Sequence, residues 1–182
     1  SVVPTSVPFA PTIGTATAGN GEATITFTPP ASDGGSAITS YTVTSSPGGL
    51  SASGGSSPIT ITGLTNGVTY TFSVIATNIY GSSISSALSN SVTPATTPNA
   101  PTIGTATAGN GEATITFTPP ANNGGSAITS YNVTSSPGGL SASGGSSPIT
   151  LTGLTNGVTY TFTVTATNAV GSSPSSATSN SI

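Results

Sequence analysis

The sequence lacks six residue types entirely, namely Lys, Arg, His, Cys, Met and Trp. Without Lys or Arg it cannot neutralise phosphate groups, which excludes nucleic-acid binding and argues against electrostatic attachment to anionic membranes. Without Cys, disulfides and thiolate metal ligands are excluded. Amide cross-links that begin at a Lys side chain are excluded as well. A fibre built from this chain is therefore held by non-covalent contacts or by links in other parts of a longer protein.

Acidic residues are scarce, because Glu22, Asp33 and Glu112 are the only carboxylate side chains. A general base would have to be one of these three, and a Ser nucleophile has no His or Lys to activate it. Calcium takes six to eight oxygens and usually several carboxylates, whereas Asp33 is alone in its loop and Asn122-Asn123 stand there in the second half. The sequence therefore predicts no enzyme, no catalytic residue, no cofactor and no bound metal.

Long apolar runs are also missing, since no stretch approaches the roughly 20 residues that a membrane-spanning helix needs. No direct membrane insertion is expected. Ser and Thr instead supply 68 of the 182 residues. A surface rich in hydroxyls and nearly free of charge repels itself weakly, so association with other copies is not discouraged.

What is present is a repeat with a period of 90 residues. The stretches 10–92 and 100–182 align without a gap and differ at eleven positions. The preceding residues keep the same frame, because Ser1, Val2, Pro4 and Pro8 match Ser91, Val92, Pro94 and Pro98. Self-similarity at a fixed period indicates a repeat architecture, and the phase of the two ends suggests that the array is longer.

Each repeat shows the two-residue apolar period of half-buried strands and no helical period. Glu22–Thr28 alternates strictly, and Tyr70–Asn78 gives the cleanest alternation. Gly19-Asn20-Gly21 is typical of a tight turn between antiparallel strands. The strands expected in the first repeat are Thr12–Ala18, Glu22–Thr28, Ile38–Ser46, a weak edge within Leu50–Ser57, Ile59–Thr62, Tyr70–Asn78 and a last strand from Gly81 through Leu88 toward Thr93.

About seven short antiparallel strands in some 90 residues predict an all-β chain of two tandem immunoglobulin-like β-sandwiches. We expect domain 1 at residues 10–93 and domain 2 at residues 100–182. Residues 94–99 then form a short, stiff, Pro-containing linker, and residues 1–9 form a linker or the tail of a preceding repeat.

The motifs of both repeats resemble the fibronectin type III domain. Residues 23–43 are similar to that family's B strand, Pro-rich loop and C strand, and residues 64–70 resemble its EF corner. The resemblance implies that Leu64 and Tyr70 form a tyrosine corner. Phe27 and Phe117 stand where the family usually has Trp. No Arg-Gly-Asp sequence is present, so integrin-type adhesion is not implied, and near-identical neighbouring copies resemble bacterial secreted and surface arrays.

Five of the eleven differences fall close together and make the first repeat larger or more apolar. The residues concerned are Ile75, Ile79, Tyr80, Ile84 and Leu88, which become Thr165, Ala169, Val170, Pro174 and Thr178. Exposed apolar side chains rimmed by polar residues mark interaction surfaces, so these five form a candidate self-association surface. The alternatives are drift at neutral positions, or packing of these residues against the segment that carries Val2, Val3, Val7 and Phe9.

The sequence therefore predicts a structural repeat of an extracellular, bacterial surface fibre, stalk or filament that acts as spacer and self-association module. Its partners are other copies or neighbouring repeats. One alternative is a spacer in a secreted polysaccharide-degrading enzyme, and another is a weak carbohydrate-binding adhesin module, which the scarcity of exposed aromatics disfavours. Glycans remain a further partner class. Asn132-Val133-Thr134 matches a glycosylation sequon, but it falls within an expected strand and we interpret it as accidental.

Overall fold

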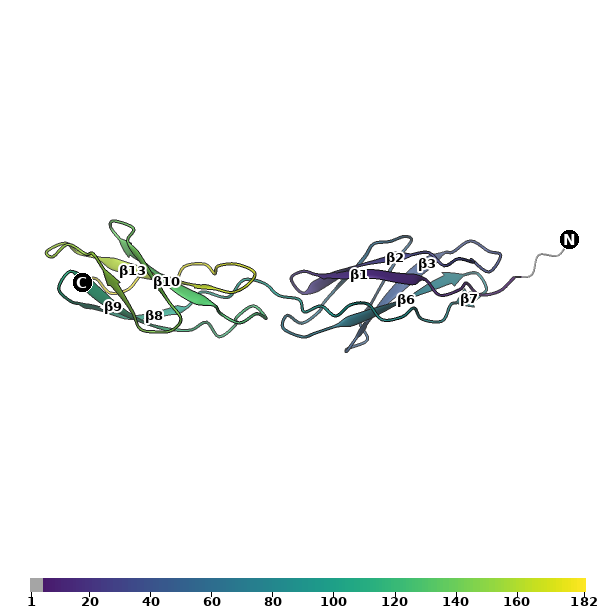
Figure 1. Ribbon diagram of the computed structural model, residues 1–182, viewed down its shortest axis with the longest axis horizontal. Coiled ribbons are helices and arrows are strands. Elements are labelled where there is room, and N and C mark those ends of the chain that lie inside the picture. Colours follow the sequence, from purple (N-terminus) through teal and green to yellow (C-terminus); the bar gives the residue numbers. More distant parts are fainter. Residues whose placement is uncertain (1–4) are drawn as a thin grey trace. The chain divides into compact units, whose positions relative to one another are not determined.

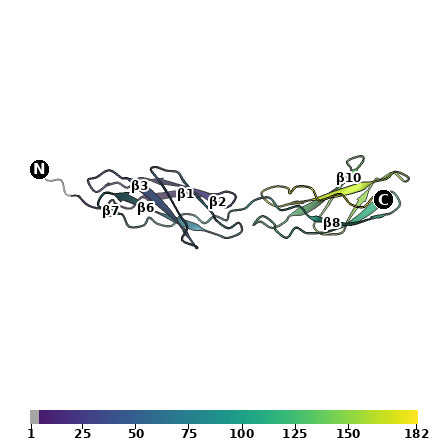
Figure 2. The ribbon, with the colours of Figure 1, turned by 180° about the vertical axis from the view of Figure 1, so that it is seen from behind.

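The computed structural model describes residues 5–182 and divides into two compact units, residues 1–95 and residues 96–182 (Figures 1 and 2). Each unit is built from β-strands and connecting loops. Over the described range there is no helix long and apolar enough to cross a membrane. The all-β fold with two tandem sandwiches is thus confirmed. Val2, Val3 and the rest of residues 1–4, which we expected to form a linker or tail, lie outside the described residues.

Unit 1 is a sandwich of a three-stranded and a four-stranded antiparallel sheet. Its sheets have the orders β1-β2-β5 and β4-β3-β6-β7. The strands are β1 (Thr12–Ala18), β2 (Glu22–Thr28), β3 (Ser40–Ser46), β4 (Ser51–Gly54), β5 (Ile59–Thr62), β6 (Thr71–Asn78) and β7 (Gly81–Ser82).

Unit 2 repeats this arrangement with two three-stranded sheets in the orders β12-β9-β8 and β11-β10-β13. A single bridge between Thr167 and Ser172 takes the place of the short strand β7. The strands are β8 (Thr102–Ala108), β9 (Glu112–Thr118), β10 (Ser130–Ser136), β11 (Ser141–Gly144), β12 (Ile149–Thr152) and β13 (Thr161–Thr167).

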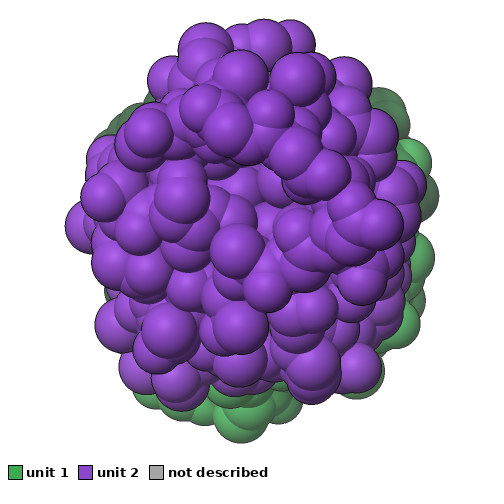
Figure 3. Space-filling model, turned by 90° about the vertical axis from the view of Figure 1, so that its left-hand side faces the viewer, with its two compact units in different colours: residues 1–95 green, residues 96–182 purple. Residues whose placement is uncertain are grey.

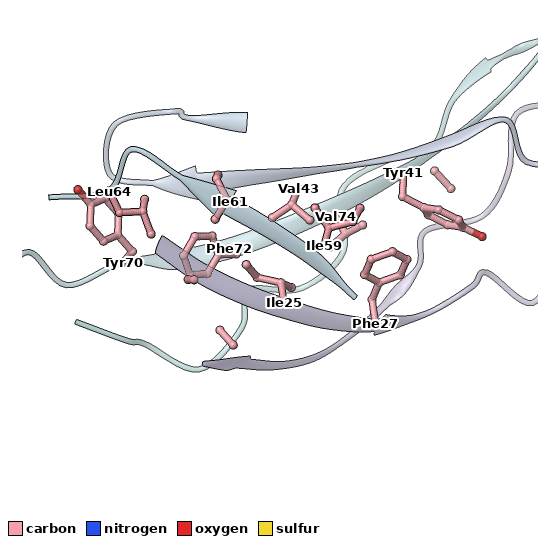
Figure 4. Close-up of a cluster of buried hydrophobic side chains, with 13 residues drawn as sticks. Ile25, Phe27, Tyr41, Val43, Ile59, Ile61, Leu64, Tyr70, Phe72 and Val74 are labelled. Carbon is pink, nitrogen blue, oxygen red and sulfur yellow. The ribbon is translucent and has the colours of Figure 1, made fainter. Parts of the chain in front are cut away.

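The core of unit 1 comes from the inward residues of strands that alternate as the sequence predicts. Along β6 every second side chain, from Phe72 to Asn78, is buried. Figure 4 shows the cluster, with Leu64 and Tyr70 close together at one end and Phe27 and Tyr41 at the other. The ring centroids of Phe27 and Tyr41 lie 4.8 Å apart, so these two aromatic side chains pack against each other at that end of the core.

A network at one pole ties the first hairpin to the corner before β6. The Tyr70 hydroxyl accepts a hydrogen bond from the backbone N–H of Thr65 at 3.1 Å, which gives the tyrosine corner implied by the resemblance. The side chain of Asn66 accepts from the Gly21 N–H at 2.8 Å and donates to the Asn20 side chain. The short turn after β1 is therefore held by side chains as well as by strand pairing.

The last strand of the first repeat is much shorter than predicted, because β7 ends at Ser82. The chain nevertheless stays beside β6 by a different pattern. The N–H of Ser83 donates to the Ala76 carbonyl at 2.8 Å, and the Ser83 Oγ accepts from the Ala76 N–H at 3.0 Å. Ser89 makes the same two bonds to Phe72. A serine at every third position thus makes the hydrogen bonds to β6 that a neighbouring strand would make at every second residue. We call residues 83–89 the serine ladder.

The segment expected as a linker is divided between the units. The side chains of Pro94 and Pro98 are fully buried. Ala95 donates a backbone hydrogen bond to Gly19 of unit 1, whereas Thr96 donates one to Gly124 of unit 2. Residues 94 and 95 are therefore part of the first sandwich, and residues 96–99 are part of the second.

Candidate interaction surface

The five apolar residues singled out in the first repeat lie on β6, in the loop after it and along the serine ladder. Four side chains are well exposed, by 72% for Ile79, 50% for Tyr80, 80% for Ile84 and 63% for Leu88. Ile75 is half-buried on the outer face of β6, where it pairs with Thr42 of β3. We call these five residues the apolar set.

The serine ladder explains why Ile84 and Leu88 point into solvent. Its three serines turn their backbone N–H and hydroxyl groups toward β6. The hydroxyls of Ser83 and Ser86 also donate to the carbonyl of the following residue. With the serines fixed inward, the intervening side chains face outward. The ladder also keeps Ile84 next to the stretch of β6 that carries Ile75.

Asn78 positions Ile79 and Tyr80. Its buried side chain donates to the Ser6 and Asp33 carbonyls at 2.8 and 2.7 Å, and its Oδ1 accepts from the Tyr80 N–H at 2.8 Å. One amide thus fastens the loop after β6 to two other segments, since it satisfies three backbone groups at once. Tyr80 is held at the backbone, while its ring remains half-exposed.

The N-terminal segment lies beside this loop without covering it. Ser6 donates its N–H to the Gly34 carbonyl at 2.9 Å, and Phe9 donates to the Ser32 carbonyl at 3.0 Å. The Val7 side chain lies so close to Gly81 that an added Cβ there would be 3.1 Å from it. Ile79 and Tyr80 nevertheless stay exposed, so among residues 5–9 nothing buries them.

Unit 2 has the same scaffold with less exposed apolar surface. Its Asn168 makes equivalent bonds to the Thr96 and Asn123 carbonyls and to the Val170 N–H. Val170 is the one residue of the five equivalents that is a large, exposed hydrophobic side chain in this unit. The loops after β6 and β13 are therefore held by equivalent hydrogen bonds, but the loop of unit 1 exposes larger apolar side chains than the loop of unit 2.

The three carboxylates occupy turns and strand starts. Glu22 and Glu112 begin β2 and β9, and Asp33 accepts a hydrogen bond from the Gly35 N–H at 2.8 Å. Residues 5–182 contain no group of three or more His, Cys, Asp or Glu side chains placed to hold a metal ion. Burial raises the pKa of the Tyr41 hydroxyl above its usual value.

A feature that the sequence reasoning missed is a pocket of about 350 Å³ at one pole of unit 2. Figure 3 looks onto this pole, where the purple surface is hollowed. Its walls come from the turn after β8, the start of β9, the corner before β13 and Ile182.

Comparison with known proteins gives one family for both units. The model of the fibronectin type III domain matches residues 9–92 and again residues 98–182. The chain is 35% identical over 117 residues to the Kelch domain-containing protein SSO1033 of Saccharolobus solfataricus, a match that covers 63% of this chain and 16% of that protein.

Two solved structures are similar to this chain at low sequence identity, and the titin structure shares the arrangement of strands. Domains A168–A170 of titin match 93% of the chain at 22% identity with a TM-score of 0.58, and the chain covers 61% of that structure. The FN1–FN3 domains of chicken CNTN1 match 94% of the chain at 23% identity with a TM-score of 0.49, and the chain covers 65% of them. The chain thus spans a part of each of these relatives.

Proposed function

Since this chain belongs to the fibronectin type III family and consists of two such domains in tandem, we propose that it is a structural repeat of an extracellular, bacterial surface fibre, stalk or filament. It acts as a spacer and as a self-association module, without catalysis. The fold alone does not specify this role, because the family's scaffold serves many functions. The exposed apolar surface of unit 1 supports this role.

The observation that carries the proposal is the exposure of the apolar set on a molecule with almost no charge. Burying one exposed Ile or Leu side chain gains about 1.5–3 kcal/mol. Ile79, Ile84 and Leu88 are each more than 60% exposed, and the chain has three carboxylates and no basic side chain to oppose association. A second copy is the occupant that this surface suits, since an uncharged, hydroxyl-rich face complements itself.

We propose a role without catalysis because the sequence lacks the residue types that most enzymes use. The whole sequence offers no His, Lys, Cys or Arg to act as base, nucleophile or electrophile. Asp33 is engaged in its own turn through the Gly35 N–H. A structural role needs none of these groups.

Electron microscopy of the native protein tests the proposal. Ordered polymers are expected, whereas dispersed particles contradict it. The double variant I79A/Y80V, which gives unit 1 the loop residues of unit 2, is expected to weaken assembly at least tenfold in critical concentration. The control is Leu50→Ala, which removes another partly exposed apolar side chain outside the apolar set. Unchanged assembly of I79A/Y80V rules out this surface as the contact.

A second candidate is a spacer within a secreted multidomain enzyme. It is favoured by the match to 16% of a longer, Kelch domain-containing protein, because a match of that extent involves only a part of the longer chain. This function predicts that the 182-residue chain is monomeric at high concentration, as sedimentation velocity can determine. It also predicts that I79A/Y80V sediments like the unaltered chain.

A further inference from the structure

The four-stranded sheet of unit 1 has two borders that differ in how their backbone groups are satisfied. One border is the serine ladder, whose serines occupy amide and carbonyl groups of β6. The other border is β4, which pairs with β3 alone. Within residues 5–182, no backbone hydrogen bond links Ser51 or Ser53 of β4 to a residue outside the sheet. We call the outer side of β4 the open edge.

The hydrogen bonds between β3 and β4 show which backbone groups point out of the open edge. Directly before β4, the Leu50 carbonyl accepts from the Ser45 N–H of β3 at 2.8 Å. Because successive residues of an antiparallel strand direct these groups to opposite sides, Ser51 and Ser53 direct their N–H and C=O groups away from β3. The hydroxyls of Thr42 and Ser53 lie 2.8 Å apart, as expected in a pair that exchanges no backbone bonds and brings its side chains closer.

The open edge lacks most of the features by which proteins block an edge strand. The strand carries no charge, no Pro and no bulge, since its register with β3 is continuous. The space beside it is also open, because a Cβ added at Gly48, Gly49 or Gly55 would meet no atom within 4 Å. Its one protection is its length of four residues, which limits a partner to few hydrogen bonds. Another backbone can therefore approach β4 closely.

The borders of the three-stranded sheet are less suited to a further strand. On one side, β1 shifts register against β2 between Ile13 and Ala16. The Asn90 side chain also occupies both backbone groups of Ala16, at 2.8 Å to the N–H and 3.0 Å to the carbonyl. On the other side, β5 begins directly after Pro58, which has no N–H to donate. Among these borders, β4 is therefore the one best suited to pair with another chain.

We propose that the open edge of β4 pairs antiparallel with the same edge of a second copy, about a two-fold axis at Ala52. Ser51 of each copy then lies opposite Ser53 of the other. Since each such pair exchanges two backbone bonds, all outward N–H and C=O groups of these serines are satisfied. A second copy suits the edge because both sides are small and uncharged and the contact is isologous. The proposal rests on the self-association proposed above and adds a contact outside the apolar set.

Unit 2 repeats the open edge. Its strand β11 has the sequence of β4, the same register with the neighbouring strand and the same open glycine positions on either side. The apolar set, by contrast, is mostly replaced by smaller or polar residues in unit 2. The edge therefore recurs with the period of 90 residues. Each pairing of four-residue strands is weak, and several pairings between the same two copies strengthen their association.

Cysteine cross-linking of the full chain tests the register, because the sequence contains no other thiol. At the two-fold axis the Cα atoms of Ala52 in the two copies lie about 4.5 Å apart, as in antiparallel pairs without backbone bonds. A disulfide spans this distance. The variant A52C/A142C is therefore expected to form disulfide-linked oligomers under mild oxidation. The control S56C/S146C carries its thiols in the exposed loop after each edge and stays mostly monomeric. Equal yields from the two variants overturn the proposal.

Sedimentation of the full chain measures what the outward N–H groups contribute. The variant S53P/S143P removes an N–H that the sheet does not use, so association is expected to weaken about tenfold, the upper range for one backbone hydrogen bond. The matched control is S53A/S143A, which loses the same hydroxyl, keeps the N–H and leaves association unchanged. If circular dichroism shows that S53P/S143P is unfolded, the cross-linking result decides.

These experiments separate the edge contact from the proposed function. If polymers form, A52C/A142C does not cross-link and S53P/S143P has no effect, the edge contact is wrong and the self-association role stands. If A52C/A142C cross-links selectively but the unaltered protein forms no polymer, the edge contact is supported and the filament role is contradicted.

Discussion

Ser86 and Val74 are joined by two hydrogen bonds of opposite sense. The Ser86 N–H donates to the Val74 carbonyl at 2.9 Å, and the Ser86 Oγ accepts from the Val74 N–H at 3.0 Å. A single serine thus satisfies both backbone groups of a fully buried residue in the centre of β6. A polar side chain performs here what the backbone of a neighbouring strand normally does.

Ser86→Ala is expected to destabilise unit 1 by about 1–3 kcal/mol, because it leaves the buried Val74 N–H without an acceptor. Urea unfolding measures the loss, and amide hydrogen exchange of Val74 should accelerate. Ser85→Ala is the control, since the exposed Ser85 lies on the same segment and makes none of these bonds. Equal effects of the two substitutions contradict the role assigned to the ladder.

Tyr70→Phe removes the hydroxyl that accepts the Thr65 N–H. We expect a loss of about 1 kcal/mol in the free energy of unfolding, the usual net contribution of one such bond. Tyr80→Phe removes a hydroxyl from a half-exposed ring and should change stability little. Thermal unfolding of both variants checks the difference, and a stability of Tyr70→Phe equal to that of the unaltered chain argues against the corner bond.

Gly34→Ala tests the docking of the N-terminal segment. Gly34 has a φ of 75°, and a Cβ there would collide with the Ser6 carbonyl. Gly48→Ala is the control, because its φ of 89° carries similar backbone strain in open space. Gly48→Ala should cost about 1–2 kcal/mol from that strain, and Gly34→Ala about 1–3 kcal/mol more from the collision. Hydrogen exchange at the Ser6 amide should rise in Gly34→Ala alone.

Alkaline pH should destabilise unit 1 through Tyr41. Burial raises the pKa of its hydroxyl, so the unfolded chain loses this proton at a lower pH than the folded chain does. The resulting stability is complete below about pH 10, the ordinary value for tyrosine, and falls as pH rises toward the folded pKa. Unfolding measured between pH 8 and 11 should show a smaller decline for Tyr41→Phe. An identical decline in both proteins contradicts the assignment.

The strands were predictable wherever burial follows a period of two. The bounds of β2 and β5 match the expected ranges, because apolar residues alternate there with Thr. The bounds of β1 match as well, although its burial does not alternate and its pairing with β2 shifts register between Ile13 and Ala16. The serine ladder was not foreseen, since its period of three is carried by hydroxyl side chains and apolar periodicity does not detect it. The exposure of Ile79 and Ile84 agrees with their prediction as surface residues, while their role in binding remains a prediction.

The pole of each sandwich was harder to predict. The sequence predicts that Pro94 and Pro98 belong to a linker between the domains, because Pro interrupts strands. Both are buried instead. The loops of Gly19 and Gly67, far apart in sequence, converge on residues 94 and 95, and residues 96–99 are held by the loop of unit 2 that carries Asn122 and Gly124. That convergence depends on tertiary structure, and the local sequence does not encode it. The recurrence of Pro4 and Pro8 in the same frame was the available hint.

The serine ladder also determines how the four-stranded sheet of unit 1 ends. An exposed edge strand presents a regular row of amide and carbonyl groups on which a foreign chain can stack, and proteins commonly block that edge with lysines. This protein has no lysine to use. A border with a three-residue period, whose hydroxyls already bind the carbonyls of Ile84 and Ala87, does not match the spacing of an incoming strand. This one edge of the sheet thereby disfavours the addition of a further strand by geometry, without electrostatic repulsion.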